Sequence, residues 1–284
     1  MEQVCLITGA NSGIGWVTAR ELAKAGMTVL MVCRDERKGE AARREIVAAS
    51  GNERVSLLRC DLSDQEDIVQ LASEVRRRHN HLDVLLHNAG LIGEKRTVTA
   101  QGLETTLAVN HLAPFLLTHL LLPCLRRSRA PRIVTVSSEA HRLARLDFND
   151  LQSQKRYTPL IAYADSKLAN ILFTRSLADR LRHEGITANC LHPGGVATNF
   201  GAGFGSGLFG LAMTLARPFF ISPEKGAETS IFLAASPSVE GVSGQYFDRK
   251  KPKQPSQKAL SQYNAQRLWE ISEQLTRAGE RMIE

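Results

Sequence analysis

Short apolar runs alternate along the chain with longer segments in which apolar residues recur every three or four positions. The short runs are typical of buried strands, and the longer pattern is typical of amphipathic helices. We expect strands at Val4–Ile7, Thr28–Val32, Val55–Leu58, Asp83–His87, Arg132–Val136, Ile186–Leu191 and Gly244–Phe247. We expect helices at Val17–Ala25, Glu36–Ala49, Asp64–Arg78, Gln101–Arg127, Ala162–Leu181, Pro223–Ala235 and from about Ser256 to Ala278.

Strands that alternate with helices predict a parallel sheet covered on both faces. We therefore predict an α/β fold, a single doubly wound Rossmann domain over residues 1–247 with a mostly parallel seven-stranded sheet flanked by helices. Residues 248–284 are expected to form a charged linker and a C-terminal amphipathic helix. Pro114 and Pro123 are expected to bend or divide the long helix over 101–127.

Composition narrows the class of protein. The chain has 284 residues, 43% hydrophobic and 23% charged, with five cysteines and no C-x-x-C pair. Reduced thiols, a cytoplasmic location and no metal site are therefore expected. We find no signal peptide and no apolar run of about 18 residues, so no transmembrane anchor is expected. The net charge of +7 is spread over several helices, which favours solvated helix faces over nucleic-acid binding and leaves peripheral membrane contact open.

The candidate chemistry gathers where strands end. Gly9, Arg34, Asp61, Asn88, Ser138 and Pro193 all follow predicted strands. In parallel α/β sheets, ligands bind at the carboxyl ends of the strands. The segment Thr8–Gly15 also lies between a strand and a helix, as in dinucleotide phosphate sites, where glycines admit the pyrophosphate to the helix N-terminus. These positions together predict a dinucleotide site.

The end of the second strand bears on the choice of cofactor. An acidic residue there would hold the 2′-hydroxyl of NAD, but Cys33 occupies the position and Arg34 follows it. A guanidinium suits the 2′-phosphate of NADP. Arg34 could instead pair with Asp35 or be an ordinary surface arginine. Asp61 could accept a hydrogen bond from adenine or cap the next helix with Ser63.

Tyr163 and Lys167 lie four residues apart on a predicted helix, so they share a face. A nearby ammonium lowers the pKa of a phenol, which could then exchange a proton with a substrate oxygen. The alternative is an exposed tyrosine and lysine that share a helix face without any function.

Several ordered motifs together resemble the short-chain dehydrogenase/reductase family. They are Thr8-Gly-x-x-x-Gly-x-Gly15, Asn88-Ala-Gly90, Asn110, Ser138, Tyr163-x-x-x-Lys167 and Pro193-Gly194. Further stretches resemble the retinol dehydrogenases and their soluble relatives: Cys33-Arg-Asp, Val136-Ser-Ser-Glu-Ala-His141, Asp150-Leu-Gln-Ser, Lys155-Arg-Tyr157, the run from Tyr163 to Thr174 and Arg267-Leu-Trp269. One departure is His87, which replaces an asparagine common in the family.

The resemblance implies a role for each matching residue. Tyr163 would be the general acid or base, Lys167 would lower its pKa and hold the nicotinamide ribose, Ser138 rather than Ser137 would bind the reacting oxygen, and Asn110 would position a relay water. NADP(H) would be held by Gly9, Asn11, Ser12, Gly13, Ile14, Gly15, Arg34, Lys38, Asp61, Leu62, Asn88, Ala89, Gly90, Tyr163, Lys167, Pro193, Gly194, Val196 and Thr198.

The resemblance also implies an apolar alcohol, aldehyde or ketone as substrate, under an apolar lid at about 200–222. The alternative for that segment is a hydrophobic helix packed on the core. Only three residues precede Val4, where membrane-bound retinol dehydrogenases carry an apolar anchor, so retinoid specificity is not carried over.

Two rival functions remain: a protochlorophyllide reductase, whose functional cysteine is replaced here by Gly195, and a non-catalytic NADPH sensor. Family members often form homo-oligomers through the helices that contain Asn110 and Tyr163.

Overall fold

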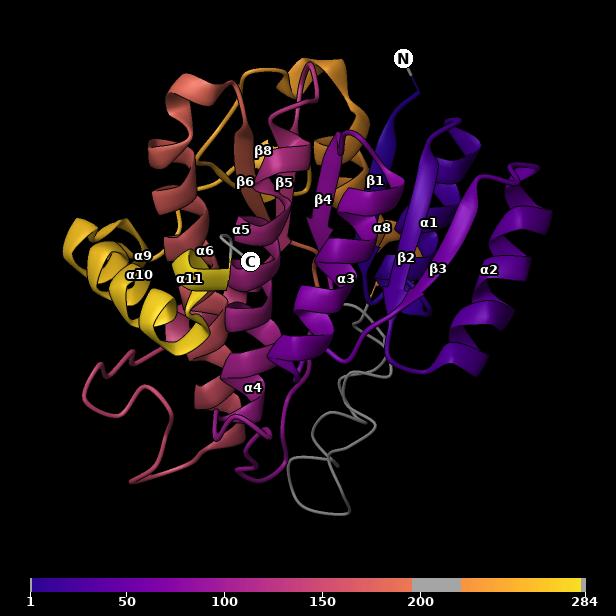
Figure 1. The fold of residues 1–284 in the computed structure, drawn as a ribbon. Helices are drawn as coiled ribbons and strands as arrows, with labels where there is room; N and C mark the ends of the chain where they lie inside the picture. Colours follow the sequence, from indigo (N-terminus) through magenta and orange to yellow (C-terminus); the bar gives the residue numbers. More distant parts are fainter. Residues whose placement is uncertain (1, 196–220, 282–284) are drawn as a thin grey trace.

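The computed structural model describes residues 2–195 and 221–281. Within these residues, eight strands form one sheet in the order β3-β2-β1-β4-β5-β6-β7-β8 (Figure 1). The strands are β1 Val4–Thr8, β2 Thr28–Cys33, β3 Val55–Arg59, β4 Val84–His87, β5 Arg132–Val136, β6 Thr187–His192, β7 Tyr246–Asp248 and β8 Lys251–Pro252. Neighbouring strands from β3 to β7 are parallel, and only β7 and β8 pair antiparallel. The doubly wound α/β fold is therefore confirmed.

The predicted count of seven strands was one too low. The additional strand, β8, has only two residues, Lys251 and Pro252. It pairs with β7 across a tight turn in which Arg249 and Lys250 have positive φ. So short a strand has no periodic pattern that a sequence could reveal.

Helices cover both faces of the sheet because its strands are apolar on both sides. In β1, Leu6 belongs to the core on one face, and Cys5 and Ile7 belong to the core on the other. One layer contains α1 Gly13–Lys24, α2 Glu36–Ser50 and α8 Pro223–Ala235. The opposite layer contains α3 Gln65–Arg78, α5 Ala113–Leu125 and α6 Pro159–Arg180.

The predicted helix over 101–127 begins at Thr105 and contains a change of helical type. α4 Thr105–Leu107 leads into a π-helical segment, η1 Ala108–Leu112, and then into α5. Pro114 has no N–H to donate to the carbonyl of Asn110, and the N–H of Ala113 donates to Ala108 five residues earlier. Pro123 lies inside α5 without ending it. The bend expected at Pro114 is thus a local widening of the helix around Asn110.

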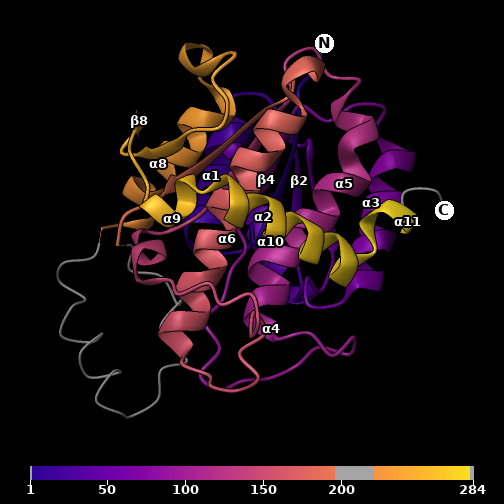
Figure 2. The same cartoon turned by 90° about the vertical axis from the view of Figure 1, so that its left-hand side faces the viewer.

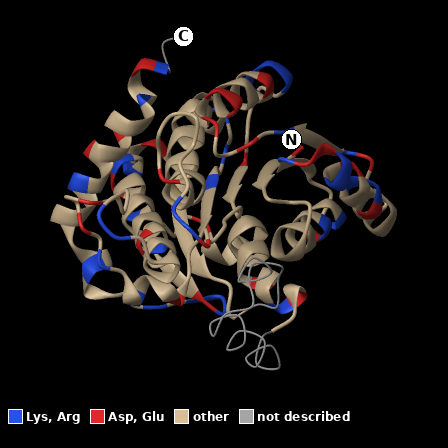
Figure 3. Ribbon diagram, turned by 90° about the horizontal axis from the view of Figure 1, so that it is seen from below, with Lys and Arg blue, Asp and Glu red and all other residues tan. Residues whose placement is uncertain are grey.

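The described residues include one helix, Thr105–Leu125, that is long and apolar enough to cross a membrane. The expectation that no apolar stretch is long enough to span a membrane was therefore wrong, and the expectation of no transmembrane anchor stays a prediction. In the structure, 94% of its most apolar window is buried inside the protein, as is typical of a core helix. In Figure 3, ribbon positions of Lys and Arg and those of Asp and Glu are interspersed over the described part of the molecule.

The C-terminal helix predicted from Ser256 to Ala278 is divided into three. They are α9 Gln257–Leu260, α10 Gln262–Thr276 and α11 Ala278–Arg281. Ser261 separates the first two, since its side chain accepts a hydrogen bond from the N–H of Asn264 and caps α10. Figure 2 shows α10 lying across the outer side of the α5 and α6 layer.

Candidate active site

Glycines let the loop between β1 and α1 pack closely on itself at the N-terminus of the helix. Gly9 has φ +67°, and a Cβ at Gly15 would lie 2.2 Å from the carbonyl oxygen of Gly9. Ser12, at the N-cap of α1, makes no side-chain capping hydrogen bond in the described structure, and the first turn contains no acidic residue. The predicted residues Asn11, Gly13 and Ile14 are half-buried beside it. Helix N–H groups without a side-chain cap suit a phosphate.

Thr8 and Asn88 hold this loop against the end of β4. The Thr8 hydroxyl accepts hydrogen bonds from the N–H groups of Asn88 and Ala89 at 3.0 and 3.1 Å. The Asn88 amide donates to the carbonyls of Thr8 and Gly9 at 2.9 and 3.2 Å. Asn88 was predicted to hold the cofactor, and in the structure its side chain shapes the loop that would do so. Thr8 is the first residue of the glycine motif. Its contacts with Asn88 and Ala89 could not be predicted, because those residues lie some 80 positions further along the chain.

Two other predicted cofactor residues lie in one small pocket. Leu62 and Ala89 line it together with Thr8, His87 and Val109. His87 is buried, which lowers its pKa to about 3, and its Nε2 lies 2.8 Å from the Thr118 hydroxyl. The histidine is therefore neutral, and its hydrogen bond runs to α5 rather than across the sheet.

The end of β2 presents basic side chains to solvent. The Arg34 side chain is 74% exposed, and its nearest ion pair is with Asp61 at 3.9 Å rather than with Asp35. Asp35 instead caps α2 by accepting the N–H of Lys38 at 3.0 Å, which lowers the pKa of its carboxyl. Asp61 accepts hydrogen bonds from the N–H and hydroxyl of Ser63. The guanidinium of Arg34 is thus only weakly engaged.

Four predicted catalytic residues converge beside Gly90. A Cβ at Gly90 would lie 3.3 Å from Lys167 Nζ and 3.4 Å from Asn110 Oδ1. Lys167 Nζ lies 5.5 Å from the centre of the Tyr163 ring, and Ser138 forms a hydrogen bond with the Tyr163 hydroxyl. α6, η1 and the end of β5 therefore bring these side chains to one place.

The structure distinguishes the two serines after β5. The hydroxyl of Ser137 is buried and donates to the backbone carbonyl of Lys167 at 2.8 Å. Ser138 is half-buried, and its hydroxyl accepts the N–H of Ala140 at 3.2 Å, which leaves its hydrogen for Tyr163 or a substrate. The geometry therefore favours Ser138, as the resemblance implied.

Burial shifts the pKa values of the tyrosine and lysine toward their neutral forms. Burial raises the pKa of Tyr163 to about 12, although the hydrogen bond with Ser138 acts to lower it. Burial lowers the pKa of Lys167 to about 8, and its ammonium donates to the carbonyl of Val136 at 3.0 Å. The expectation that the pKa of Tyr163 is depressed is not met, because the loss of hydration on burial outweighs the lowering effect of the Ser138 hydrogen bond.

The amide of Asn110 is fully engaged. It accepts the N–H of Leu91 at 2.8 Å and donates to the carbonyl of Leu91 and the hydroxyl of Ser166, both at 2.9 Å. These bonds tie α6 to the loop after Gly90. A further residue that the sequence did not single out for a role, Tyr157, donates to the carbonyl of Gly93 at 2.9 Å and so fixes the same loop. In the sequence, the only indication of a role for Tyr157 was that the tripeptide Lys155-Arg-Tyr157 resembles the retinol dehydrogenases.

The last predicted cofactor segment follows β6. Pro193 and Gly194 stand at the carboxyl end of that strand, beside the other site residues. The N–H of Ile221 donates to the carbonyl of Gly195 at 2.7 Å, which joins the two ends of the intervening segment. Val196, Thr198 and the predicted lid at about 200–222 lie outside the described residues, apart from Ile221 and Ser222.

Comparison with known proteins decides the family. The model of the short chain dehydrogenase family matches residues 3–207. Retinol dehydrogenase 12 of Mus musculus is 44% identical over 270 residues, which cover 95% of this chain and 85% of that protein. The chain belongs to the short-chain dehydrogenase/reductase family. It falls in the retinol dehydrogenase-like branch and is an oxidoreductase acting on CH–OH or C=O groups.

Solved structures similar to this chain agree with the fold. An uncharacterised protein from Mycobacterium paratuberculosis has a TM-score of 0.79 at 36% identity, covering 97% of this chain and 93% of that one. A short chain dehydrogenase from Shigella flexneri 2a in complex with NADP has a TM-score of 0.70 at 27% identity, covering 88% and 97%. A nicotinamide cofactor fits the site described above, since within the described residues Ser12 makes no side-chain capping hydrogen bond and the first turn of α1 has no acidic residue to oppose a phosphate.

Proposed function

We propose that this dehydrogenase uses NADP(H) to interconvert an apolar alcohol and its aldehyde or ketone, with Tyr163 as general acid and base. The observation that carries the proposal is the convergence of Tyr163, Ser138 and Lys167 beside the loop at Gly90 and the glycine loop. Proton exchange with a carbonyl oxygen needs a donor within hydrogen-bonding reach and a partner that orients it.

The protein's part in the reaction follows from the hydrogen bonds. When the cofactor is bound at the glycine loop, its reduced nicotinamide would supply the hydride that the carbonyl carbon needs. Tyr163 then gives its proton to the oxygen, and the Ser138 hydroxyl donates to the same oxygen as charge develops there. A pKa of about 12 keeps the phenol protonated at neutral pH, as reduction requires. Lys167 is still mostly charged at pH 7 with a pKa of about 8, and it stabilises the phenolate left behind.

Asn110 would act through its backbone. Its amide is engaged, but Pro114 cannot donate to its carbonyl. That carbonyl would accept a hydrogen bond from a water that links Lys167 to solvent and returns the proton to Tyr163.

Preference for NADP(H) is supported by the basic side chains at the end of β2. Arg34 is exposed and weakly paired, and Lys38 lies one helical turn further on, 67% exposed. Both would contact a 2′-phosphate. The complex of the Shigella flexneri dehydrogenase with NADP supports the same choice.

An apolar substrate is supported by the retinol dehydrogenases that the chain resembles. The test is a screen for NADPH consumption with all-trans-retinal and with aliphatic, aromatic and terpenoid aldehydes and ketones. Turnover that is lost in Ser138→Ala supports the proposal. Binding of NADPH without turnover across the whole panel would favour a non-catalytic sensor and overturn it.

A further inference from the structure

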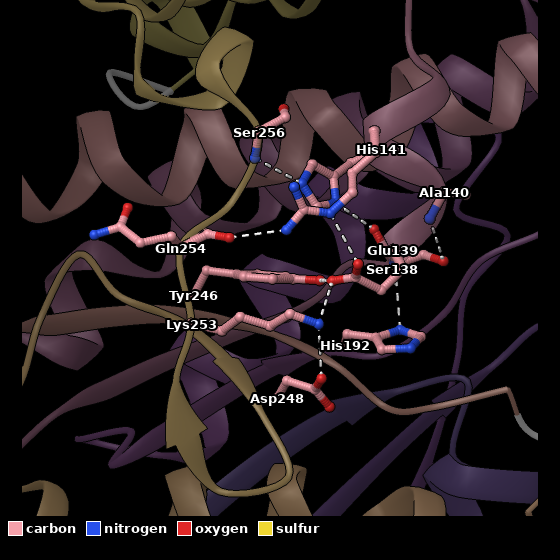
Figure 4. Close-up of polar contacts among 11 residues, drawn as sticks. Ser138, Glu139, Ala140, His141, His192, Tyr246, Asp248, Lys253, Gln254 and Ser256 are labelled. Atoms are coloured by element: carbon pink, nitrogen blue, oxygen red, sulfur yellow. Dashed lines mark hydrogen bonds and ion pairs between the residues drawn. The ribbon is translucent and has the colours of Figure 1, made fainter.

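The turn that carries Ser138 is attached to a strand hairpin far along the chain. Ser138 caps the short 3-10 helix η2 Glu139–Leu143, and its carbonyl accepts hydrogen bonds from the N–H and the Nδ1 of His141 at 3.1 and 2.7 Å. On the other side of the imidazole, the N–H of Ser256 donates to Nε2 at 3.1 Å. Figure 4 shows the His141 ring between Ser138 and Ser256.

These two bonds define the tautomer of His141. A backbone N–H can only donate, so Nε2 must carry a lone pair. A backbone carbonyl can only accept, so Nδ1 must carry the hydrogen. The imidazole is fully buried, and burial lowers its pKa, so the neutral ring with hydrogen on Nδ1 is the form that fits.

Charged groups around η2 hold the same hairpin. The Glu139 carboxylate accepts the Tyr246 hydroxyl at 2.7 Å and pairs with Lys253 at 3.1 Å and with Arg142 at 2.9 Å. Burial acts to raise the pKa of Glu139, but these partners outweigh it and lower that pKa to about 2. The Tyr246 ring also packs edge-on against His141, with centres 5.2 Å apart.

The start of η2 is fixed from the neighbouring strand as well. The N–H of Glu139 donates to Nδ1 of His192, at the end of β6, at 3.3 Å. Lys253 pairs with Asp248 at 2.9 Å, which closes the hairpin on itself. The groups that face His141 are therefore Glu139 and Arg142 from η2, Tyr246 and Lys253 from the hairpin, and His192 from β6.

We propose that His141 is a positioning residue, which transmits the placement of residues 246–256 to the hydroxyl of Ser138 through its Nδ1–H. The inference rests on the proposed role of Ser138. The carbonyl and hydroxyl of Ser138 belong to one cap, so losing the shorter of the two hydrogen bonds to the carbonyl loosens the cap and lets the hydroxyl turn away from Tyr163. The C-terminal hairpin thereby becomes part of the support of the catalytic serine.

Two substitutions of His141 each remove one of the two hydrogen bonds of its ring, the one to Ser138 or the one from Ser256. In His141→Asn, the amide nitrogen takes the place of Nδ1 and still donates to Ser138, but the acceptor for Ser256 is lost. In His141→Gln, the amide oxygen takes the place of Nε2 and still accepts from Ser256, but the side-chain donor to Ser138 is lost and only the backbone N–H of residue 141 still donates to that carbonyl. Each variant loses one buried hydrogen bond, so both should lower the melting temperature by a similar amount.

We expect His141→Gln to lower kcat about tenfold or more with the best substrate of the screen, and His141→Asn to stay within about threefold of the parent. The Kd for NADPH should be unchanged in both, since His141 does not reach the glycine loop. In a Ser138→Ala background, His141→Gln should cost nothing further, because the two residues act as one unit. Equal losses in both variants, no loss in His141→Gln, or full additivity with Ser138→Ala would overturn the proposal.

A second measurement does not depend on activity. Nitrogen-15 NMR of histidine-labelled protein, with the His141 signals assigned from the His141→Asn variant, reports which ring nitrogen carries hydrogen. The proposal requires hydrogen on Nδ1. Hydrogen on Nε2 would overturn it even if the protein reduces carbonyls, and hydrogen on Nδ1 in a protein that turns over nothing would place the fault in the proposed function instead.

Discussion

Arg34 carries a guanidinium that is exposed and only weakly paired in the structure. Its guanidinium is 74% exposed and lies 3.9 Å from Asp61, and such surface pairs contribute about 0–1 kcal/mol. Asp35, which the sequence offered as an alternative partner, caps α2 instead. The charged group can therefore turn to a 2′-phosphate at small cost.

We predict that Arg34→Ser weakens NADPH binding by about ten- to a hundredfold, because hydrogen bonds to charged groups contribute about 1.5–3 kcal/mol. NADH, which has no 2′-phosphate, should bind with an unchanged Kd. Both constants can be measured by nucleotide fluorescence. Arg44→Ser is the matched control, since it removes an equally exposed arginine from α2, the helix that follows Arg34. Equal effects of Arg34→Ser on both nucleotides would contradict the NADP assignment.

At the residue scale, the sequence predicted well which residues lie together in the site. It predicted less well which contacts each of them makes. Gly9 and Ser138 follow parallel strands whose carboxyl ends share one edge of the sheet. Asn110 is brought to that edge by η1, and Tyr163 and Lys167 are brought there by α6. That the hydroxyl of Ser137 is used by Lys167, or the amide of Asn88 by the glycine loop, depends on partners far away in the chain. The pKa of Tyr163 was misjudged because a sequence shows the neighbouring charge but not the burial that opposes it.

Among the elements, α10 has the clearest structural role. Trp269 is 7% exposed and packs against Phe115 and His119 of α5, with ring centres 5.0 and 5.2 Å apart. Arg180 of α6 lies 4.1 Å from the centre of the Trp269 ring. His111 Nε2, in the π-helical segment, lies 2.9 Å from the Ser272 hydroxyl. The C-terminal helix is thus packed onto the two helices that carry the catalytic residues.

We predict that Trp269→Ala lowers the free energy of unfolding by about 3–5 kcal/mol, as is typical when a large buried aromatic is removed. Tyr263→Ala is the matched control, because Tyr263 is on the same helix and 70% exposed. Urea unfolding at pH 7 measures both. Similar stabilities for the two variants would mean that α10 is not held by this aromatic cluster.

The observed ends of the helices agree with the predicted ends where a polar side chain caps the helix. They differ from the predicted ends where the backbone is irregular. α2 begins at Glu36 as predicted, since Asp35 caps it. The π-helical segment before Pro114 and the break at Ser261 were not foreseen, because a helical pattern of apolar residues continues through both. The family resemblance identified Asn110 without showing that its helix widens there.

At the scale of the whole molecule, buried neutral histidines make stability depend on pH. Burial lowers the pKa of His87 to about 3 and that of His111 to about 4, against about 6.5 in an unfolded chain. Below pH 6.5 the unfolded chain binds protons that the folded protein cannot, so stability falls as the pH falls toward the folded pKa values.

We predict that these two histidines together reduce the free energy of unfolding by about 4 kcal/mol between pH 7 and pH 5, roughly 2 kcal/mol each. Urea unfolding at the two pH values measures the loss. His87→Asn should lose about 2 kcal/mol less than the parent over the same interval, compared with its own stability at pH 7. An identical pH dependence in the variant would show that His87 is not held neutral.

The packing of α10 over α5 and α6 affects how copies of the chain could form a homo-oligomer. The sequence suggested a homo-oligomer formed through the helices of Asn110 and Tyr163, and α10 lies over the outer side of that layer (Figure 2). The oligomer stays a prediction, and we propose that any such assembly would use another surface. Peripheral membrane contact and a cytoplasmic location likewise stay predictions.

The central claim is that Tyr163 exchanges the proton with the substrate oxygen. Steady-state NADPH consumption by Tyr163→Phe, with the best substrate of the carbonyl screen, tests it most directly. The ring remains, so packing and the Kd for NADPH should be preserved, while kcat should fall by about 10²-fold or more. A Tyr163→Phe enzyme that turns over within a few-fold of the parent would contradict the assignment.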